Sequence, residues 1–262
     1  MRLIVLGCSG SGPGPESPAS GYLVEAGATR LSLDLGNGTL GALQRHADPF
    51  SLDATVFSHL HPDHCSDFPS LVVHRRYHPR PPFDATARKL AVHAPAGAHT
   101  RFARADAVTE ADYARTDLTD VFSFHDLVVG EPFTVGTGED AVTVTAHEVV
   151  HVCPAYALRL EHRGRVLTYS GDTAACPGLV EAARDADLLL CEASWPHAEA
   201  GPPGVHLSGR EAGEHAAAAA GARRLVVTHV PAWFDRESLG AEAKAAFGGT
   251  VELARPDAVF EV

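Results

Sequence analysis

Histidine and aspartate side chains crowd into one short segment of the chain. The sequence His59-Leu-His61-Pro-Asp63-His64 places four potential metal ligands within six residues, directly after the apolar run Ala54–Phe57. On an extended segment, residues i and i+2 point to the same side, so His59 and His61 can bind one ion. A turn at the intervening proline can direct Asp63 and His64 toward a second ion. Imidazole and carboxylate ligands suit zinc, and also manganese or iron, so the segment predicts a divalent-metal site.

The pattern HxHxDH resembles the signature of the metallo-β-lactamase superfamily. Further positions of that family are matched in chain order by Asp34, His151, Asp172 and His229. The resemblance implies an α/β fold, specifically a four-layered αββα sandwich with the active site at one edge of the sheets. It also implies two divalent metal ions, most simply zinc.

The same resemblance implies an assignment of ligands. One ion is expected on His59, His61 and His151, and the other on Asp63, His64 and His229. Asp172 is expected to bridge the two ions, and Asp34 to orient ligands from behind them. His147 is an alternative to His151, which is favoured because it precedes Pro-Ala-Tyr156 as in the family.

Two more segments narrow the resemblance to ribonuclease Z. Cys191-Glu-Ala-Ser194 resembles the His-Glu-Ala-Thr segment of those enzymes, and His206-Leu-Ser208 resembles their His-Ser-Thr segment. Carried over, His206 becomes the candidate general acid and Glu192 the residue that orients it. Ser208 and Glu211 form a capping box that fixes the start of a helix over 208–220, and a helix N-terminus favours anions.

The resemblance therefore implies a dinuclear metal-dependent hydrolase, most simply a phosphodiesterase. Two cations lower the pKa of a bridging water toward roughly 7 and hold the resulting hydroxide beside the phosphorus. His206 would protonate the leaving oxygen, and Asp63 could accept a proton from the nucleophilic water. The candidate substrates are a small phosphodiester, a cyclic nucleotide or an RNA 3′ end. The alternatives are an acyl hydrolase acting on a lactone or thioester, and a non-catalytic metal-stabilised binding protein, which is disfavoured because every ligand position is filled.

One departure from ribonuclease Z concerns the substrate. Enzymes that mature tRNA carry a long arm where this chain has only Glu161-His-Arg-Gly164, so it resembles an armless short form. The chain has 21 basic and 33 acidic residues, a net charge of −12, which argues against a broad nucleic-acid-binding surface. The basic and aromatic run His74–His78 could line a substrate entrance, but a solvated helix face is the favoured interpretation.

The elements that position these residues are short strands with helices between them. We expect strands at 3–6, 22–24, 31–35, 54–57, 90–92, 166–169, 188–190 and 225–227, with a strand-rich stretch over 121–160. We expect helices at 39–46, 66–77, 96–105 and 208–220, the last stopped by Gly221. Without a composition break or long linker, the chain is predicted to form a single domain over 1–262.

Composition sets the remaining expectations. The five cysteines are widely spread without a CxxC pair, as in a cytoplasmic protein with reduced thiols. No apolar run approaches the ~20 residues needed to cross a membrane. The segment Gly10–Pro15 lacks the spacing of a nucleotide-binding loop and is expected to be a connection. The ribonuclease Z resemblance implies a homodimer as one assembly option.

Overall fold

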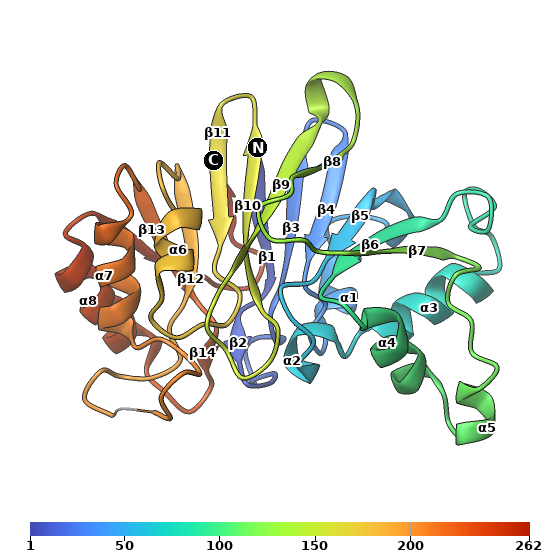
Figure 1. Cartoon of the computed structure of the whole chain (residues 1–262), viewed down its shortest axis with the longest axis horizontal. Coiled ribbons are helices and arrows are strands. Elements are labelled where there is room, and N and C mark those ends of the chain that lie inside the picture. The colour runs from blue at the N-terminus through green and yellow to red at the C-terminus, as the bar shows by residue number, and fades with distance from the viewer. Residues whose placement is uncertain (200) are drawn as a thin grey trace.

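The computed structural model describes residues 1–199 and 201–262, and two large β-sheets face each other at its centre (Figure 1). The first sheet has seven strands, in the order β16 (Val259–Glu261), β1 (Arg2–Gly7), β3 (Gly21–Ala26), β4 (Thr29–Leu33), β5 (Ala54–Val56), β6 (Leu90–Ala94) and β7 (Phe122–Asp126). From β4 to β7 the neighbouring strands run parallel.

The second sheet also has seven strands, in the order β15 (Thr250–Leu253), β13 (Arg224–Thr228), β12 (Leu188–Glu192), β11 (Arg165–Tyr169), β10 (Tyr156–His162), β9 (Val142–Glu148) and β8 (Phe133–Val135). The strands β11, β12, β13 and β15 run parallel. Two short strands, β2 (Ser9–Gly10) and β14 (Val230–Pro231), pair with each other and link the two halves of the molecule.

Helices cover the outer faces of both sheets. Those on the side of the first sheet are α1 (Thr39–Leu43), α2 (Pro62–Cys65), α3 (Phe68–Tyr77), α4 (Ala98–Asp106) and α5 (Glu110–Tyr113). Those on the side of the second sheet are α6 (Pro177–Ala182), α7 (Gly209–Ala218) and α8 (Arg236–Phe247). The four-layered αββα sandwich predicted from the sequence is therefore confirmed (Figure 1). None of the helices in the described residues is long and apolar enough to span a membrane.

Strand β1 shows why both faces of each sheet are apolar. Leu3 and Val5 contribute to the core between the two sheets, whereas Ile4 and Leu6 contribute to the core beneath the helices of the first sheet. Successive side chains of a strand point to opposite faces, so a strand packed on both sides is apolar throughout. A third core packs α6, α7 and α8 against the outer face of the second sheet.

The parallel strands bring their carboxyl ends to one edge of the sandwich. Asp34 directly follows β4, Glu192 ends β12 and His229 directly follows β13. The opposite edge carries both termini, where Met1 and Val262 are joined by a backbone hydrogen bond of 2.9 Å (Figure 1). Ligand sites in α/β folds typically lie just beyond the carboxyl ends of strands, and the candidate residues gather there.

Most predicted elements are present with small shifts at their ends, and the differences are local. The segment after His61 is the short helix α2, which directs Asp63 and His64 where a simple turn was expected. The capping box of α7 is present, but the helix ends at Ala218, before the predicted stop at Gly221. The helices α5, α6 and α8 were not predicted.

The predicted solvated face at 74–78 is wrong for Arg75. Arg75 is only 3% exposed, with its guanidinium over the rings of Phe50 and Phe122. Its neighbour Arg76 forms an ion pair of 2.8 Å with Asp120. Both arginine side chains of this run therefore contact other parts of the protein, Arg75 through aromatic rings and Arg76 through a carboxylate.

Strands β10 and β11 are joined by a tight hairpin where tRNA-processing relatives were expected to carry an arm. Residues His162 and Arg165 are paired, and the two residues between them have positive φ, 48° for Arg163 and 73° for Gly164. Two successive positive φ values are typical of a type I′ turn, which matches the twist of a β-hairpin. The structure therefore leaves no room in this hairpin for an inserted arm.

Candidate metal centre

The structure brings all seven predicted metal ligands together, although they lie on five different segments. They come from the β5–α2 connection and α2, the loop after β9, and the carboxyl ends of β11 and β13. These residues are His59, His61, Asp63, His64, His151, Asp172 and His229.

Two groups of four donors match the expected pair of sites. In one group, the donor atoms of His59, His61, His151 and Asp172 lie within 4.8 Å of one another, and His151 Nε2 is 3.1 Å from His61 Nδ1. The loop that carries His151 is held by a hydrogen bond of 2.8 Å between its Nδ1 and the carbonyl of Val205. Its competitor His147 lies on β9 and belongs to none of the donor clusters in the described residues.

The second group joins Asp63, His64, Asp172 and His229, also within 4.8 Å. His229 Nε2 lies 3.2 Å from Asp63 Oδ2 and 3.4 Å from Asp172 Oδ2. Asp172 is shared by both groups, as expected of a bridging carboxylate.

Two buried atoms in this cluster support a bound cation. His64 Nε2 and Asp172 Oδ1 are buried and have no hydrogen-bond partner among the described residues, although they lie 3.2 Å apart. A buried polar atom without a partner is costly unless something else satisfies it, and a divalent ion between nitrogen and carboxylate donors would do so. The residues present therefore fit two divalent metal ions.

Asp34 holds the second group of ligands from behind. Its carboxylate is fully buried and accepts hydrogen bonds from His64 Nδ1 at 2.7 Å, Tyr169 Oη at 2.8 Å, and both the backbone nitrogen and the hydroxyl of Ser58 at 2.8 Å. With its Nδ1 proton bound to Asp34, His64 presents Nε2 toward the other donors. Outer partners of this kind fix the tautomer and orientation of a metal-ligating histidine.

Two residues of the site have left-handed backbone conformations. The φ angles are 58° for Asp34 and 54° for His229, where non-glycine residues are uncommon. Behind His229 lies Gly10 on β2, and a Cβ at Gly10 would collide with the carbonyl oxygen of His229 and lie 2.9 Å from its Nδ1. The pairing of β2 with β14 therefore requires glycine at this position.

His206 and Glu192 form the pair that the sequence predicted. Glu192 is fully buried, and its Oε1 accepts from His206 Nδ1 at 2.9 Å. Burial lowers the pKa of His206, but the charge and hydrogen bond of Glu192, together with Asp172, outweigh this and raise it to about 9. His206 Nδ1 lies 3.8 Å from Asp172 Oδ2, so the pair borders the metal ligands.

Glu192 also belongs to a third donor cluster with His206 and His229. However, its two oxygens already accept from Thr173 N at 2.7 Å and Ser194 Oγ at 2.8 Å as well as from His206. A carboxylate occupied in this way is better suited to positioning than to ligation. The hydroxyl of Ser194 also lies 3.0 Å from His229 Nδ1, so Ser194 links the carboxylate of Glu192 to the candidate ligand His229.

Charges within the cluster shift several pKa values in opposite directions. Burial and the charge of His64 lower the pKa of His59 well below its usual value. Although burial raises the pKa of Asp63, the hydrogen bond from His229 and the charge of His64 hold it below its usual range. A neutral imidazole beside an ionised carboxylate is the state in which both can donate to a metal.

Several residues beside the site were missed by sequence reasoning. Ser58, Tyr169 and Ser194 hold site residues by hydrogen bonds. Cys153 Sγ lies 3.8 Å from His61 Nε2, and the Trp195 ring lies 5.4 Å from the ring of His206. Ser58, Cys153, Ser194 and Trp195 lie in or next to segments that the sequence singled out, which was the available signal. Tyr169 precedes Asp172 by three residues, but its contact with Asp34 spans 135 positions and no local pattern predicts it.

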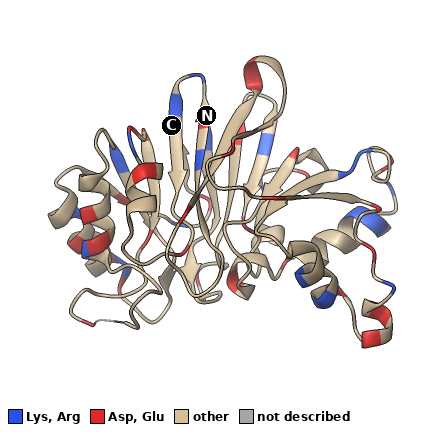
Figure 2. Ribbon diagram, viewed as in Figure 1, with Lys and Arg blue, Asp and Glu red and all other residues tan. Residues whose placement is uncertain are grey.

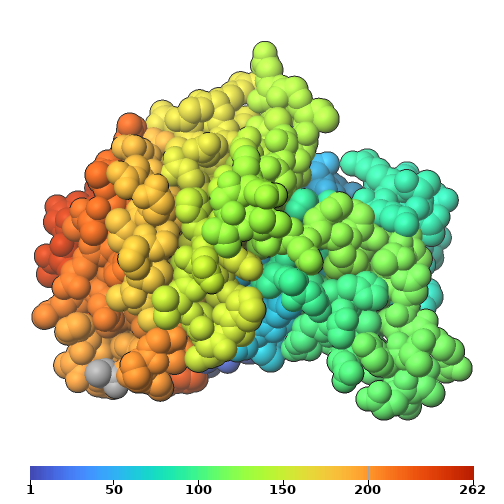
Figure 3. Space-filling model, viewed as in Figure 1, coloured from blue at the N-terminus to red at the C-terminus, as the bar shows by residue number. Residues whose placement is uncertain are grey.

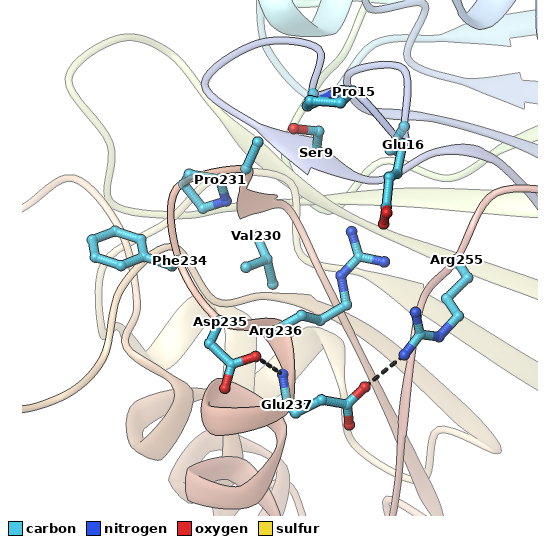
Figure 4. Close-up of a pocket in the computed structure, with 13 residues that line it drawn as sticks. Ser9, Pro15, Glu16, Val230, Pro231, Phe234, Asp235, Arg236, Glu237 and Arg255 are labelled. Atoms are coloured by element: carbon cyan, nitrogen blue, oxygen red, sulfur yellow. Dashed lines mark hydrogen bonds and ion pairs between the residues drawn. The ribbon is translucent and has the colours of Figure 1, made fainter.

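Two pockets differ in their relation to this centre. A pocket of about 360 Å³ is lined by His206, Trp195 and the start of α7. Another, of about 470 Å³, lies between β2, β14 and the start of α8, and no candidate ligand lines it. Figure 4 shows Arg236 and Glu16 facing each other in that second pocket, beside the ion pair of 2.5 Å between Arg255 and Glu237. Of these two pockets, the one lined by His206 is placed to receive a substrate of the candidate centre.

Comparison with known proteins defines the family. A profile described as beta-lactamase superfamily domain matches residues 29–230, which include all seven candidate ligands. The chain therefore belongs to the beta-lactamase superfamily and has its metallo-β-lactamase fold, within a superfamily of metallo-hydrolases.

Particular relatives lie at several distances. The chain is 46% identical over 264 residues to an uncharacterized protein, Rv1339, of Mycobacterium tuberculosis, covering 100% of this chain and 92% of the relative. It is 31% identical over 304 residues to a ribonuclease Z of Myxococcus xanthus, and the match covers 97% of this chain and 95% of the relative. The crystal structure of YhfI, a metallo-beta-lactamase fold protein of Bacillus subtilis, superposes with a TM-score of 0.83 at 25% identity, covering 99% of each chain.

Proposed function

We propose that this protein is a metal-dependent phosphodiesterase that acts on a small phosphodiester. The observation that carries the proposal is the Glu192–His206 pair, placed at the border of a donor set that fits two divalent ions. A metal centre alone would suit several hydrolytic reactions. A charged histidine beside it is suited to a leaving group that needs a proton, as an alkoxide leaving a phosphodiester does.

The donor set assigns the metals to chain residues. His59, His61 and His151 would hold one ion, Asp63, His64 and His229 the other, with Asp172 shared. When bound, two divalent ions supply Lewis-acid stabilisation of phosphate charge and an activated water as nucleophile. We propose zinc, because imidazole and carboxylate donors suit it, although the same donors accept manganese or iron.

The chain's own contribution is to hold and deliver a proton. Glu192 binds His206 at Nδ1, while His206 Nε2 makes no hydrogen bond with any described residue. The Nε2 proton is therefore free to pass to a leaving oxygen, after which Glu192 keeps the neutral ring in place. Such positioned acid catalysis contributes typically 10²–10⁴-fold in rate.

Size and charge support a small substrate. The hairpin at 162–165 leaves no arm to clamp a distant part of an RNA. In addition, Lys and Arg segments are scattered over both sides of the molecule in the view of Figure 2, with Asp and Glu segments among them. The relative named ribonuclease Z supports phosphodiester chemistry, and the absence of an arm supports a shorter substrate such as a cyclic nucleotide.

A substrate panel on the purified, zinc-loaded protein tests the proposal. The panel contains bis(p-nitrophenyl) phosphate, cyclic nucleotides, a tRNA precursor with a 3′ trailer, a lactone and a thioester. We expect turnover of phosphodiesters, and the substitution His206→Ala should lower kcat on alkyl phosphodiesters by about 10²–10⁴-fold while both metals remain bound.

The matched control is His125→Ala, which removes an exposed histidine on β7 and should leave kcat unchanged. Turnover of the lactone or thioester alone would overturn the proposal in favour of an acyl hydrolase. Equal activity of the His206→Ala protein on alkyl phosphodiesters would remove the assigned acid.

A further inference from the structure

A pocket beside the metal centre carries an inference about which substrate the protein accepts. It has a volume of about 360 Å³, and His206 forms part of its wall. Apolar side chains supply much of the rest, including Val150, Ala175, Trp195 and Pro202. His206 therefore borders both the donor set and this pocket, so the pocket lies where a leaving group protonated by His206 would extend.

Trp195 is held rigidly as one wall. Its segment pairs with the start of α7 through a bridge to Ser208, and its carbonyl accepts from Gly209 N at 3.3 Å. Gly201 packs so closely against the six-membered ring of Trp195 that any side chain at position 201 would collide with the indole. A wall that is already ordered loses little conformational freedom when a planar group packs on it.

The segments that form the pocket come from distant parts of the chain. Figure 3 shows residues 149–155 (yellow-green) and 201–208 (orange) side by side at the lower edge of the molecule. The bond between His151 Nδ1 and the Val205 carbonyl joins these two segments, one of which carries a candidate ligand and the other the candidate acid. The pocket and the metal centre therefore share one framework.

A polar edge completes the lining. Glu211 Oε2 accepts from the backbone nitrogen of Ser208 at 2.8 Å and from its hydroxyl at 2.9 Å. The other oxygen, Oε1, accepts no hydrogen bond from any described residue. The pocket thus combines an aromatic and apolar wall with a free carboxylate oxygen, which favours a flat ring that carries a hydrogen-bond donor.

We propose that this pocket binds the amino-bearing base of a nucleoside, and that this nucleoside carries the oxygen released from the phosphodiester. Bases stack on aromatic side chains whatever their sequence, so Trp195 supplies affinity. Glu211 Oε1 accepts from the exocyclic amine and supplies selectivity against bases that present only a carbonyl there. The inference rests on the proposed phosphodiesterase function, and it names Trp195 and Glu211 as specificity-determining residues.

The volume limits the ligand to one nucleoside. Ligand pockets span about 300–1,000 Å³, and this pocket lies at the small end of that range. A single base with its ribose fits such a space, whereas a stacked run of bases needs a longer groove.

Titration calorimetry of the zinc-loaded protein with adenosine tests the pocket without any hydrolysis, because adenosine has no phosphodiester. The substitution Ala175→Phe places a ring in the pocket at an exposed lining position, and should weaken adenosine binding at least tenfold. The matched control Ala245→Phe, on the exposed face of α8, should bind adenosine as the unmodified protein does. Absence of adenosine binding, or equal binding by both variants, overturns the inference.

Glu211→Gln gives a readout that a purely structural role would not change. If the Gln carbonyl takes over the contact with Ser208, its amide presents hydrogen-bond donors to the pocket instead of an acceptor. We expect the unmodified protein to bind adenosine at least fivefold more tightly than inosine, and Glu211→Gln to reverse that order. An unchanged preference for adenosine contradicts the role of Glu211.

The two proposals fail separately. Adenosine binding that is sensitive to Ala175→Phe, without turnover of any phosphodiester, would keep the base pocket but remove the proposed function. Phosphodiester turnover that Ala175→Phe leaves unchanged for nucleoside and non-nucleoside substrates alike would keep the function and remove the pocket.

Discussion

The substitution Asp34→Asn isolates the role of one buried carboxylate behind the metal ligands. Asp34 Oδ2 accepts from three donors, His64 Nδ1, Ser58 Oγ and Tyr169 Oη, and its Oδ1 accepts from Ser58 N. An Asn amide has only one oxygen, so in either orientation its NH₂ group faces at least one donor. Asparagine tolerates the left-handed backbone of this position, so the change adds little backbone strain.

The expected magnitude follows from these contacts. One buried donor left without its acceptor costs about 1–3 kcal/mol of unfolding free energy. In either orientation the change also removes the negative charge beside His64, and altering the outer partner of a ligating histidine typically lowers metal affinity 10–100-fold, which corresponds to about 1.4–2.8 kcal/mol. We therefore expect Asp34→Asn to weaken binding of one zinc ion by 10–100-fold and to lower stability by about 1–3 kcal/mol.

Competition with a fluorescent zinc chelator measures the affinity, and urea unfolding of the metal-free protein measures the stability. The matched control is Tyr169→Phe, which removes one hydrogen bond to Asp34 and leaves that to His64 intact. It should cost about 1 kcal/mol of stability and change zinc affinity by less than threefold. Zinc affinity of Asp34→Asn within twofold of the unmodified protein would refute the reasoning, whatever the change in stability.

Three further expectations test other parts of the structure. Gly10→Ala places a methyl group against the backbone of His229, so we expect a loss of about 1–3 kcal/mol in stability and a lower zinc content by elemental analysis; normal values for both would contradict the close approach. Addition of zinc at 100 times its Kd to the metal-free protein should stabilise it by about 2.7 kcal/mol and raise Tm by roughly 5–10 °C in calorimetry, whereas an unchanged Tm would argue against the metal site. Gly164→Ala forces a side chain into the left-handed turn of the β10–β11 hairpin and should cost about 1–2 kcal/mol in urea unfolding, with kcat unaffected; a loss of activity would instead place this hairpin near the substrate.

The local sequence predicted those features that depend on a few neighbouring residues. Apolar runs predicted the buried strands because a strand packed on both faces must be apolar throughout. The capping box at Ser208 and Glu211 predicted the start of α7, since both of its bonds form within one helical turn. The helices α5, α6 and α8 were missed, because their start signals stand in segments without a strong apolar period.

The candidate ligands were predicted as a set because the family pattern orders them along the chain. Their grouping could not be read from spacing, since the contacts are distant in sequence. His61 meets His151 across 90 positions, and Asp63 meets His229 across 166. The structure favoured His151 over His147 because β9 carries His147 away from the donors while the following loop returns to them.

The sequence by itself determined which chemistry the chain can hold, since residue type sets what a side chain can donate, accept or bind. The tertiary structure alone decided which atoms do so. It brought Tyr169 to Asp34 across 135 positions, fixed His206 at Nδ1 through Glu192 and formed the pocket beside Trp195. The physical reason is that two sheets pack face to face, so strands far apart in the chain end at one edge, and only that packing sets the distances between their ligands.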